Sequence, residues 1–166
     1  MENKIYTIAG KKEEKFLRKK AADFDFESMN KTEISGLVSK MRKIMRAQKG
    51  IGLAANQIGL PYRIFVAEVP DKDGSLKFYA VFNPKIEKFG DESLYFEEGC
   101  LSVPATYGSV FRPEKIVLSG RDQRGKALKI KAWGLLARVF QHEVDHLEGK
   151  LFIDKAKGIH KLSEQP

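Results

Sequence analysis

The chain has 166 residues, 42% of them hydrophobic and 31% charged, and its 30 lysines and arginines against 22 acids give a formal net charge of +8. This composition predicts one folded domain over residues 1–166 and excludes disordered and collagen-like chains. No apolar run approaches the roughly 18 residues of a membrane helix and no N-terminal targeting segment is recognisable, so we expect a cytoplasmic protein with no membrane partner.

The excess positive charge lies mainly in two stretches, residues 11–20 and 40–49, where it is interleaved with acids and apolar residues. Charges at helical spacing usually form a solvated helix face. A transient attraction to RNA is the alternative interpretation. No RNA-binding signature with stacking aromatic residues is present, so no specific nucleic-acid partner is expected.

The first long helix is predicted to begin near residues 30–32. Asn30 and Glu33 have the spacing of a capping box, and apolar residues then recur at helical intervals until Gly50 ends the helix. The apolar stripe consists of Ile34, Leu37, Val38, Met41, Ile44 and Met45. The small residues of segment 50–59 then allow the backbone to approach another group closely.

The middle of the chain is predicted to be mostly antiparallel β-structure, because branched and aromatic residues alternate with turn signals. The predicted strands span residues 62–69, 76–82, 86–89, 93–96, 115–120 and 127–131. Turns at 71–74 and 121–125 join neighbouring strands, and Asn83-Pro84 is expected to break the second strand.

A last helix is predicted over about 133–148, with Gly149 as its C-terminal cap. The expected fold class is therefore α+β. In this arrangement mostly antiparallel β-sheets pack around a central C-terminal helix.

That helix carries the sequence His-Glu-Val-Asp-His at 142–146. Two histidines four residues apart lie within about 40° of each other on a helix, so they can share one metal ion. Leu135 and Val139 lie on the same stripe, which predicts a deep and partly dry metal site. The position of Glu143 on this helix suits a carboxylate that lies beside a metal-bound water better than it suits a third metal ligand.

Two histidines leave a tetrahedral ion short of one protein ligand. The extended motif with a third histidine fails, because Phe152 stands where that histidine is needed. Glu164 and His160 lie in a polar tail, which is poor support for a ligand. Cys100, in segment 98–102, is the remaining candidate, since thiolate binds first-row divalent ions strongly, although a lone cysteine is more often a small core residue.

Three segments of the sequence resemble the signature segments of the peptide deformylase family, in the same order. They are Gly-Ile-Gly-Leu-Ala-Ala-Asn-Gln at 50–57, Glu-Gly-Cys-Leu-Ser at 98–102 and Gln-His-Glu-Val-Asp-His-Leu-Glu-Gly at 141–149. The resemblance implies a metal-dependent hydrolase that removes the N-formyl group from the N-terminal methionine of newly made polypeptides and releases formate. The ends depart from the family pattern: no proline lies in 9–18, and the segment after Asp154 is short. Ribosome contact is therefore expected to be transient at most.

The resemblance also implies roles for individual residues. Cys100, His142 and His146 would hold one divalent metal ion, natively Fe2+, with Zn2+, Ni2+ or Co2+ able to occupy the same ligands. Glu143 would act as general acid and base. The side chain of Gln57 would then act as one donor to the oxyanion that develops during hydrolysis.

The resemblance assigns the second oxyanion donor to the backbone amide of Leu101. Four further residues are predicted to contact the substrate. Ile51, Leu135 and Val139 are candidates to line an apolar pocket for the methionine side chain, with plain core positions as the alternative, and Gly52 lets an extended peptide lie close. A general metalloprotease and a basic RNA-binding module are the rival functions.

Overall fold

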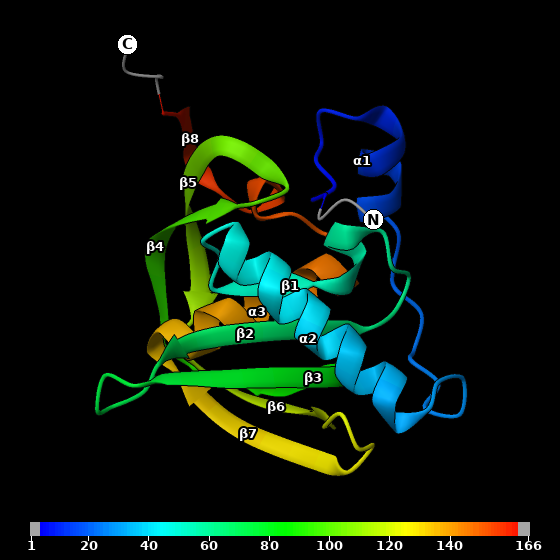
Figure 1. The fold of residues 1–166 in the computed structure, drawn as a ribbon. Coiled ribbons are helices and arrows are strands. Elements are labelled where there is room, and N and C mark those ends of the chain that lie inside the picture. The colour runs from blue at the N-terminus through cyan, green and yellow to red at the C-terminus, as the bar shows by residue number, and fades with distance from the viewer. Residues whose placement is uncertain (1–3, 163–166) are drawn as a thin grey trace.

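The structure is a computed structural model, and it describes residues 4–162. Its elements in chain order are α1 (Lys11–Leu17), α2 (Lys31–Ala47), β1 (Gly52–Ala54), the 3-10 helix η1 (Ala55–Ile58), β2 (Ile64–Pro70), β3 (Leu76–Phe89), β4 (Ser93–Cys100), β5 (Val103–Pro113), β6 (Lys115–Arg121), β7 (Ala127–Trp133), α3 (Gly134–Leu147), the 3-10 helix η2 (Phe152–Asp154) and β8 (Lys157–Lys161). The strands form two antiparallel sheets, β1-β2-β3-β6-β7 and β4-β5-β8, and α3 packs against both (Figure 1). The predicted α+β class is confirmed.

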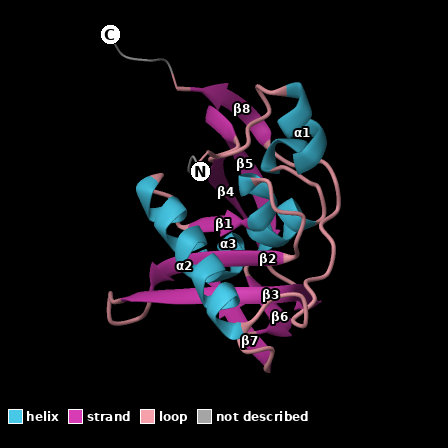
Figure 2. Ribbon diagram, turned by 45° about the vertical axis from the view of Figure 1, so that its right-hand side comes forward, coloured by secondary structure: helices cyan, strands magenta, loops and turns pink. Residues whose placement is uncertain are grey.

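Helices cover both faces of the five-stranded sheet, and β2 shows this most clearly. Phe65 and Ala67 belong to the core on the α3 side, whereas Ile64 and Val66 pack with the apolar side chains of α2. Successive side chains of a strand point to opposite faces, so a strand covered on both faces is mainly apolar on both, as residues 64–67 of β2 are. Figure 2 shows α2 lying across the strands on one side of this sheet.

The long helix α2 begins as the sequence predicts. The side chain of Asn30 accepts a hydrogen bond from the backbone of Glu33 at 2.9 Å, and the carboxylate of Glu33 accepts one from the backbone of Asn30 at 2.7 Å. At the other end Lys49 adopts a left-handed conformation with φ 56°, and the amide of Gly50 donates to the carbonyl of Met45 at 2.9 Å. These two features turn the chain away from the helix axis toward β1.

The predicted break at Asn83-Pro84 is wrong, because β3 continues through it to Phe89. The strand accommodates the proline with an irregularity: its register with β6 shifts between Phe82 and Lys85, and Asn83 adopts φ 49°. The side chain of Asn83 accepts a hydrogen bond from the backbone of Phe24 at 2.7 Å. A bulge of this kind lets a strand pass a residue that cannot donate to the ladder.

The helix α1, the strands β1, β5 and β8 and the two 3-10 helices η1 and η2 have no predicted counterpart. β5 lacks a clean alternation of apolar and polar residues, and every residue of β8 is exposed, so neither gives the periodic signal of a strand. β8 instead forms by pairing with β5, with His160 opposite Tyr107. Within residues 4–162 no helix is both long and apolar enough to cross a membrane.

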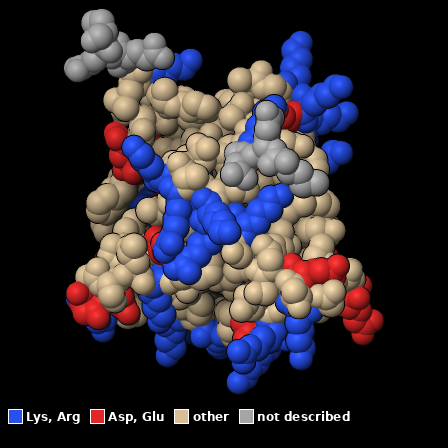
Figure 3. Space-filling model, viewed as in Figure 1, with Lys and Arg blue, Asp and Glu red and all other residues tan. Residues whose placement is uncertain are grey.

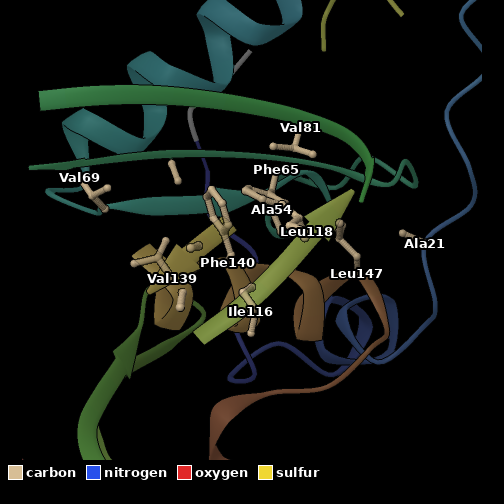
Figure 4. Close-up of a cluster of buried hydrophobic side chains, with 13 residues drawn as sticks. Ala21, Ala54, Phe65, Val69, Val81, Ile116, Leu118, Val139, Phe140 and Leu147 are labelled. Atoms are coloured by element: carbon tan, nitrogen blue, oxygen red, sulfur yellow. The ribbon is translucent and has the colours of Figure 1, made fainter. Parts of the chain in front are cut away.

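The helix α3 is fixed to the five-stranded sheet by an aromatic contact in the largest core (Figure 4). Phe140 is fully buried, and its ring centroid lies 5.3 Å from that of Phe65 and 5.2 Å from that of Tyr79. Burial of a whole aromatic side chain and its edge contacts stabilises this packing. Phe140 is therefore one of the side chains that hold α3 in place on the five-stranded sheet.

We predict that Phe140→Ala lowers the free energy of unfolding by about 3–5 kcal/mol, because the variant loses buried area and leaves a cavity. Urea denaturation followed by circular dichroism measures the effect. Phe89→Ala is the matched control, since the Phe89 side chain is 58% exposed, and it should cost under about 1 kcal/mol. Equal destabilisation by the two substitutions would show that Phe140 does not anchor α3.

Candidate active site

Cys100, His142 and His146 come together although 42 residues separate the first two in sequence. Cys100 ends β4, next to the tight turn into β5, and the two histidines lie one turn apart on α3. The sulfur lies 3.2 Å from Nε2 of His146, and the two Nε2 atoms lie 3.2 Å apart. All three potential ligand atoms are within 4.8 Å of one another.

These spacings fit a shared metal ion. Around a tetrahedral ion with bonds of about 2.3 Å to sulfur and about 2.0–2.1 Å to nitrogen, neighbouring ligand atoms lie about 3.3–3.6 Å apart. The observed distances of 3.2 Å between ligand atoms are close to these values. Burial raises the pKa of the Cys100 thiol, but His146 and His142 more than offset this and hold it well below its usual value. The donor set therefore matches a soft divalent metal.

The ring of His142 is oriented by Glu98, whose carboxylate accepts from Nδ1 of His142 at 2.9 Å. This contact leaves Nε2 directed at the sulfur and at the second histidine. The same carboxylate accepts two hydrogen bonds from Arg112, at 2.6 and 2.9 Å, and one from Arg138 at 2.7 Å. Burial would raise the pKa of Glu98, yet His142 and Arg112 hold it well below its usual range.

Glu143 is 3% exposed, and its Oε2 has no hydrogen-bond partner within residues 4–162. Burial raises its pKa to about 7, against the opposing influence of His142 and His146. Gly52 provides the space for this carboxylate, because a Cβ atom at that position would lie 2.3 Å from Oε1 of Glu143. The predicted close approach in segment 50–59 is thus made to a carboxylate that can hold or release a proton near neutral pH.

Gln57 is held beside the sulfur by η1. Its Oε1 accepts from the backbone of Ala54 at 2.9 Å, and its Nε2 donates to Oγ of Ser102 at 3.1 Å and lies 3.7 Å from Sγ of Cys100. The neighbouring Asn56 donates to the carbonyl of His146 at 2.6 Å, which ties η1 to α3. An amide N–H group is thus fixed at the edge of the cysteine–histidine cluster.

A cavity of about 890 Å³ opens above this cluster, lined by Cys100, His142 and Glu143 together with every residue predicted to contact substrate. Those lining residues are Ile51, Gly52, Gln57, Leu101, Leu135 and Val139. Ile51 and Leu135 are 45% and 51% exposed, which argues against plain core positions, whereas Val139 is 6% exposed. The pocket therefore has apolar lining residues as well as the polar cluster.

The other candidate ligands lie elsewhere. His160 is exposed on β8, and Glu164 lies outside the described residues. Asp145 accepts from Arg112 at 2.8 Å and pairs with Lys155 at 2.9 Å. Its carboxylate thus helps to hold the arginine that holds Glu98.

Glu98 and Arg112 were missed as site residues in the sequence, although Glu98 belongs to the segment that carries the resemblance. One signal was available: residues two apart on a strand share a face, so Glu98 points the same way as Cys100. Arg112 gave no such signal. The register of β4 and β5 places it opposite Leu94, and its side chain reaches from there to Glu98.

Two histidines and a buried glutamate on one helix face a cysteine at the end of a strand, under an open cavity. This arrangement is typical of a metal-dependent hydrolase. The comparisons with known proteins agree. The model of the polypeptide deformylase family matches residues 5–162. The chain belongs to this family, which confirms the resemblance found in the sequence.

Relatives of this chain give the same result. It is 44% identical to a peptide deformylase of a Picosynechococcus strain over 133 residues, 80% of this chain and 71% of the relative. A crystal structure of a probable peptide deformylase from Synechococcus phage S-SSM7 superposes with a TM-score of 0.81 at 41% identity, covering 92% of this chain and 98% of that one. The deformylase of Synechococcus elongatus, solved with actinonin, has a TM-score of 0.81 at 32% identity, with coverage of 93% and 78%.

We predict that Glu98→Gln weakens binding of a divalent metal by roughly 10- to 100-fold, because the ring of His142 loses the carboxylate that orients it. Competition with a chelating dye measures the affinity. Glu97→Gln is the matched control: Glu97 is the next residue and is exposed, whereas the carboxylate that contacts His142 is that of Glu98. An unchanged affinity in Glu98→Gln would remove Glu98 from the metal site.

Proposed function

We propose that this chain removes the formyl group from the N-terminal methionine of newly made polypeptides by metal-assisted hydrolysis at the cavity floor. In this reaction water adds to the formyl carbon, the C–N bond breaks, and formate and a free amine leave. One observation carries the proposal: a thiol and two imidazoles converge beside the buried carboxylate of Glu143, whose Oε2 has no hydrogen-bond partner within residues 4–162. Membership of the deformylase family supports the same reaction.

We infer that Cys100, His142 and His146 hold one divalent ion, with ferrous iron as the native metal and zinc, nickel or cobalt able to use the same donors. A divalent ion, when bound there, acts as a Lewis acid that lowers the pKa of water and polarises a carbonyl group. Glu98 keeps His142 in the orientation and tautomer that this requires.

Glu143 is proposed to move the protons of the reaction. A buried carboxylate in this position can accept a proton from the attacking water and then give it to the departing amine. Gly52 is required beside it, because any side chain there would displace the carboxylate. The unpartnered Oε2 of Glu143 is the atom available for this transfer.

Gln57 and the backbone amide of Leu101 are proposed to stabilise the oxygen of the formyl group as negative charge develops on it. Gln57 is supported in this role by the contacts that fix both ends of its side-chain amide. Leu101 is supported by its place directly after Cys100 and by its position in the cavity wall. Loss of one such donor typically slows turnover by about a hundred- to a thousand-fold.

The methionine side chain of the substrate is proposed to occupy the apolar side of the cavity, against Ile51, Leu135 and Val139. The substrate backbone would lie in extended form along β1, which is an edge strand of the five-stranded sheet. Gly52 in that strand carries no side chain that would keep a peptide away.

A cytoplasmic location and transient contact with the ribosome complete the proposal. The support for ribosome contact is the net charge of +8 and the lysines and arginines that gather over the C-terminal half of α2 in Figure 3. Basic side chains of this kind attract the phosphates of RNA without reading a sequence. No base-specific recognition is proposed.

The test is formate release from a formyl-Met tripeptide under anaerobic conditions, with bound metal measured in the same sample. Cys100→Ser should lose both metal and turnover, whereas Glu143→Gln should keep metal and lose at least about a hundred-fold in rate. The acetyl-Met tripeptide and an internal peptide bond serve as controls, and neither should be cleaved. Full turnover in either variant, or cleavage of internal peptide bonds, would contradict the proposal.

A further inference from the structure

Lys49 occupies an unusual place, at the end of α2 and in the wall of the cavity. Its φ of 56° lies in the left-handed region, where L side chains are disfavoured and glycine or asparagine is the common choice at the end of a helix. A lysine there costs conformational free energy that glycine would not cost. Such an outlier at a binding cavity points to a use for the side chain itself.

The charge of Lys49 is available, unlike that of the other cations in the cavity wall. Lys4 pairs with Glu13 at 2.5 Å, and Arg138 pairs with Glu98 at 2.7 Å. Within residues 4–162 no carboxylate forms an ion pair with Lys49, and its side chain is exposed. The ammonium group can therefore take a negative partner from outside the chain.

None of the acids that line the cavity pairs with Lys49 among the described residues. Glu97, on β4, is exposed, and its carboxylate lies 3.5 Å from Nε2 of His160. Glu143 lies at the cavity floor and is buried. Lys49 is thus a cation of the cavity wall that has no carboxylate partner within residues 4–162.

The distance of Lys49 from the reacting atoms determines which residue of a bound peptide the lysine can contact. Gly52 adjoins Glu143, and a Cβ on Gly50 would lie 3.0 Å from the side chain of Leu101, so segment 50–52 runs alongside the site. Lys49 is three residues from Gly52, and three residues of extended chain span at most about 10 Å. A peptide held by its formyl end at Glu143 reaches that distance with its second or third residue.

We propose that Lys49 is a specificity residue that favours an acidic side chain at the second or third position of the formyl-Met substrate. The inference rests on the proposed function and deepens it. The contact forms at an open cavity mouth, where one ion pair is worth about a two- to five-fold preference and weakens as salt is added. The gain comes with substrate binding, so it affects kcat/KM more than kcat.

The experiment compares kcat/KM for formate release from formyl-Met-Ala-Xaa and formyl-Met-Xaa-Ala peptides at low ionic strength, where Xaa is Glu, Gln or Lys. Glu and Gln have nearly the same shape, so their ratio isolates the charge. The variants are Lys49→Gly and Lys49→Asn, which suit the left-handed backbone, and Lys49→Glu. Lys43→Glu is the matched control, because Lys43 is an exposed lysine of α2 outside the cavity wall.

The wild type should prefer Glu to Gln by about two- to five-fold in at least one of the two positions, and Gln to Lys. Lys49→Gly and Lys49→Asn should abolish the preference, Lys49→Glu should reverse it, and Lys43→Glu should keep it. Equal rates for the three wild-type substrates, or an equal loss of preference in Lys43→Glu, would overturn the inference and leave the proposed function intact. No formate from any peptide would overturn both.

Discussion

The carboxylate of Glu98 accepts hydrogen bonds from Arg112, Arg138 and His142, and these contacts join β4, β5 and α3 at one buried point. A buried carboxylate needs such partners, because burying an unpaired charge is costly. The three-stranded sheet is therefore fixed in one position relative to the helix. That position brings the sulfur of Cys100 to the histidines.

Two more constraints complete the site from the other sheet. Phe140 packs α3 on the face of the five-stranded sheet, so the histidines also stand in a fixed place relative to β1 and η1. Asn56 and Gln57 on η1 then reach the helix and the sulfur from the side opposite β4. Gly52 leaves the room that the carboxylate of Glu143 needs. Each functional group is thus supported by an element outside its own segment, as a preorganised site requires.

The sequence was informative where a local period or motif carries the information. The capping box of α2, the existence of the strand β2 and the histidine pair of α3 were predicted from local composition and spacing along the chain. The β4–β5 pairing, the role of Arg112 and the edge strand β8 did not follow, because they depend on contacts between segments with no clean periodicity. The residues themselves left the third metal ligand open, and Cys100 was preferred through family resemblance.

X-ray absorption at the metal edge of the anaerobically purified protein tests the central claim most directly. One sulfur at about 2.3 Å and two imidazole nitrogens at about 2.0–2.1 Å are expected around zinc, with similar shells for iron. The sulfur shell should vanish in Cys100→Ser. A wild-type spectrum that contains only nitrogen and oxygen neighbours would mean that the cysteine does not bind the metal, and the account of this site would fail.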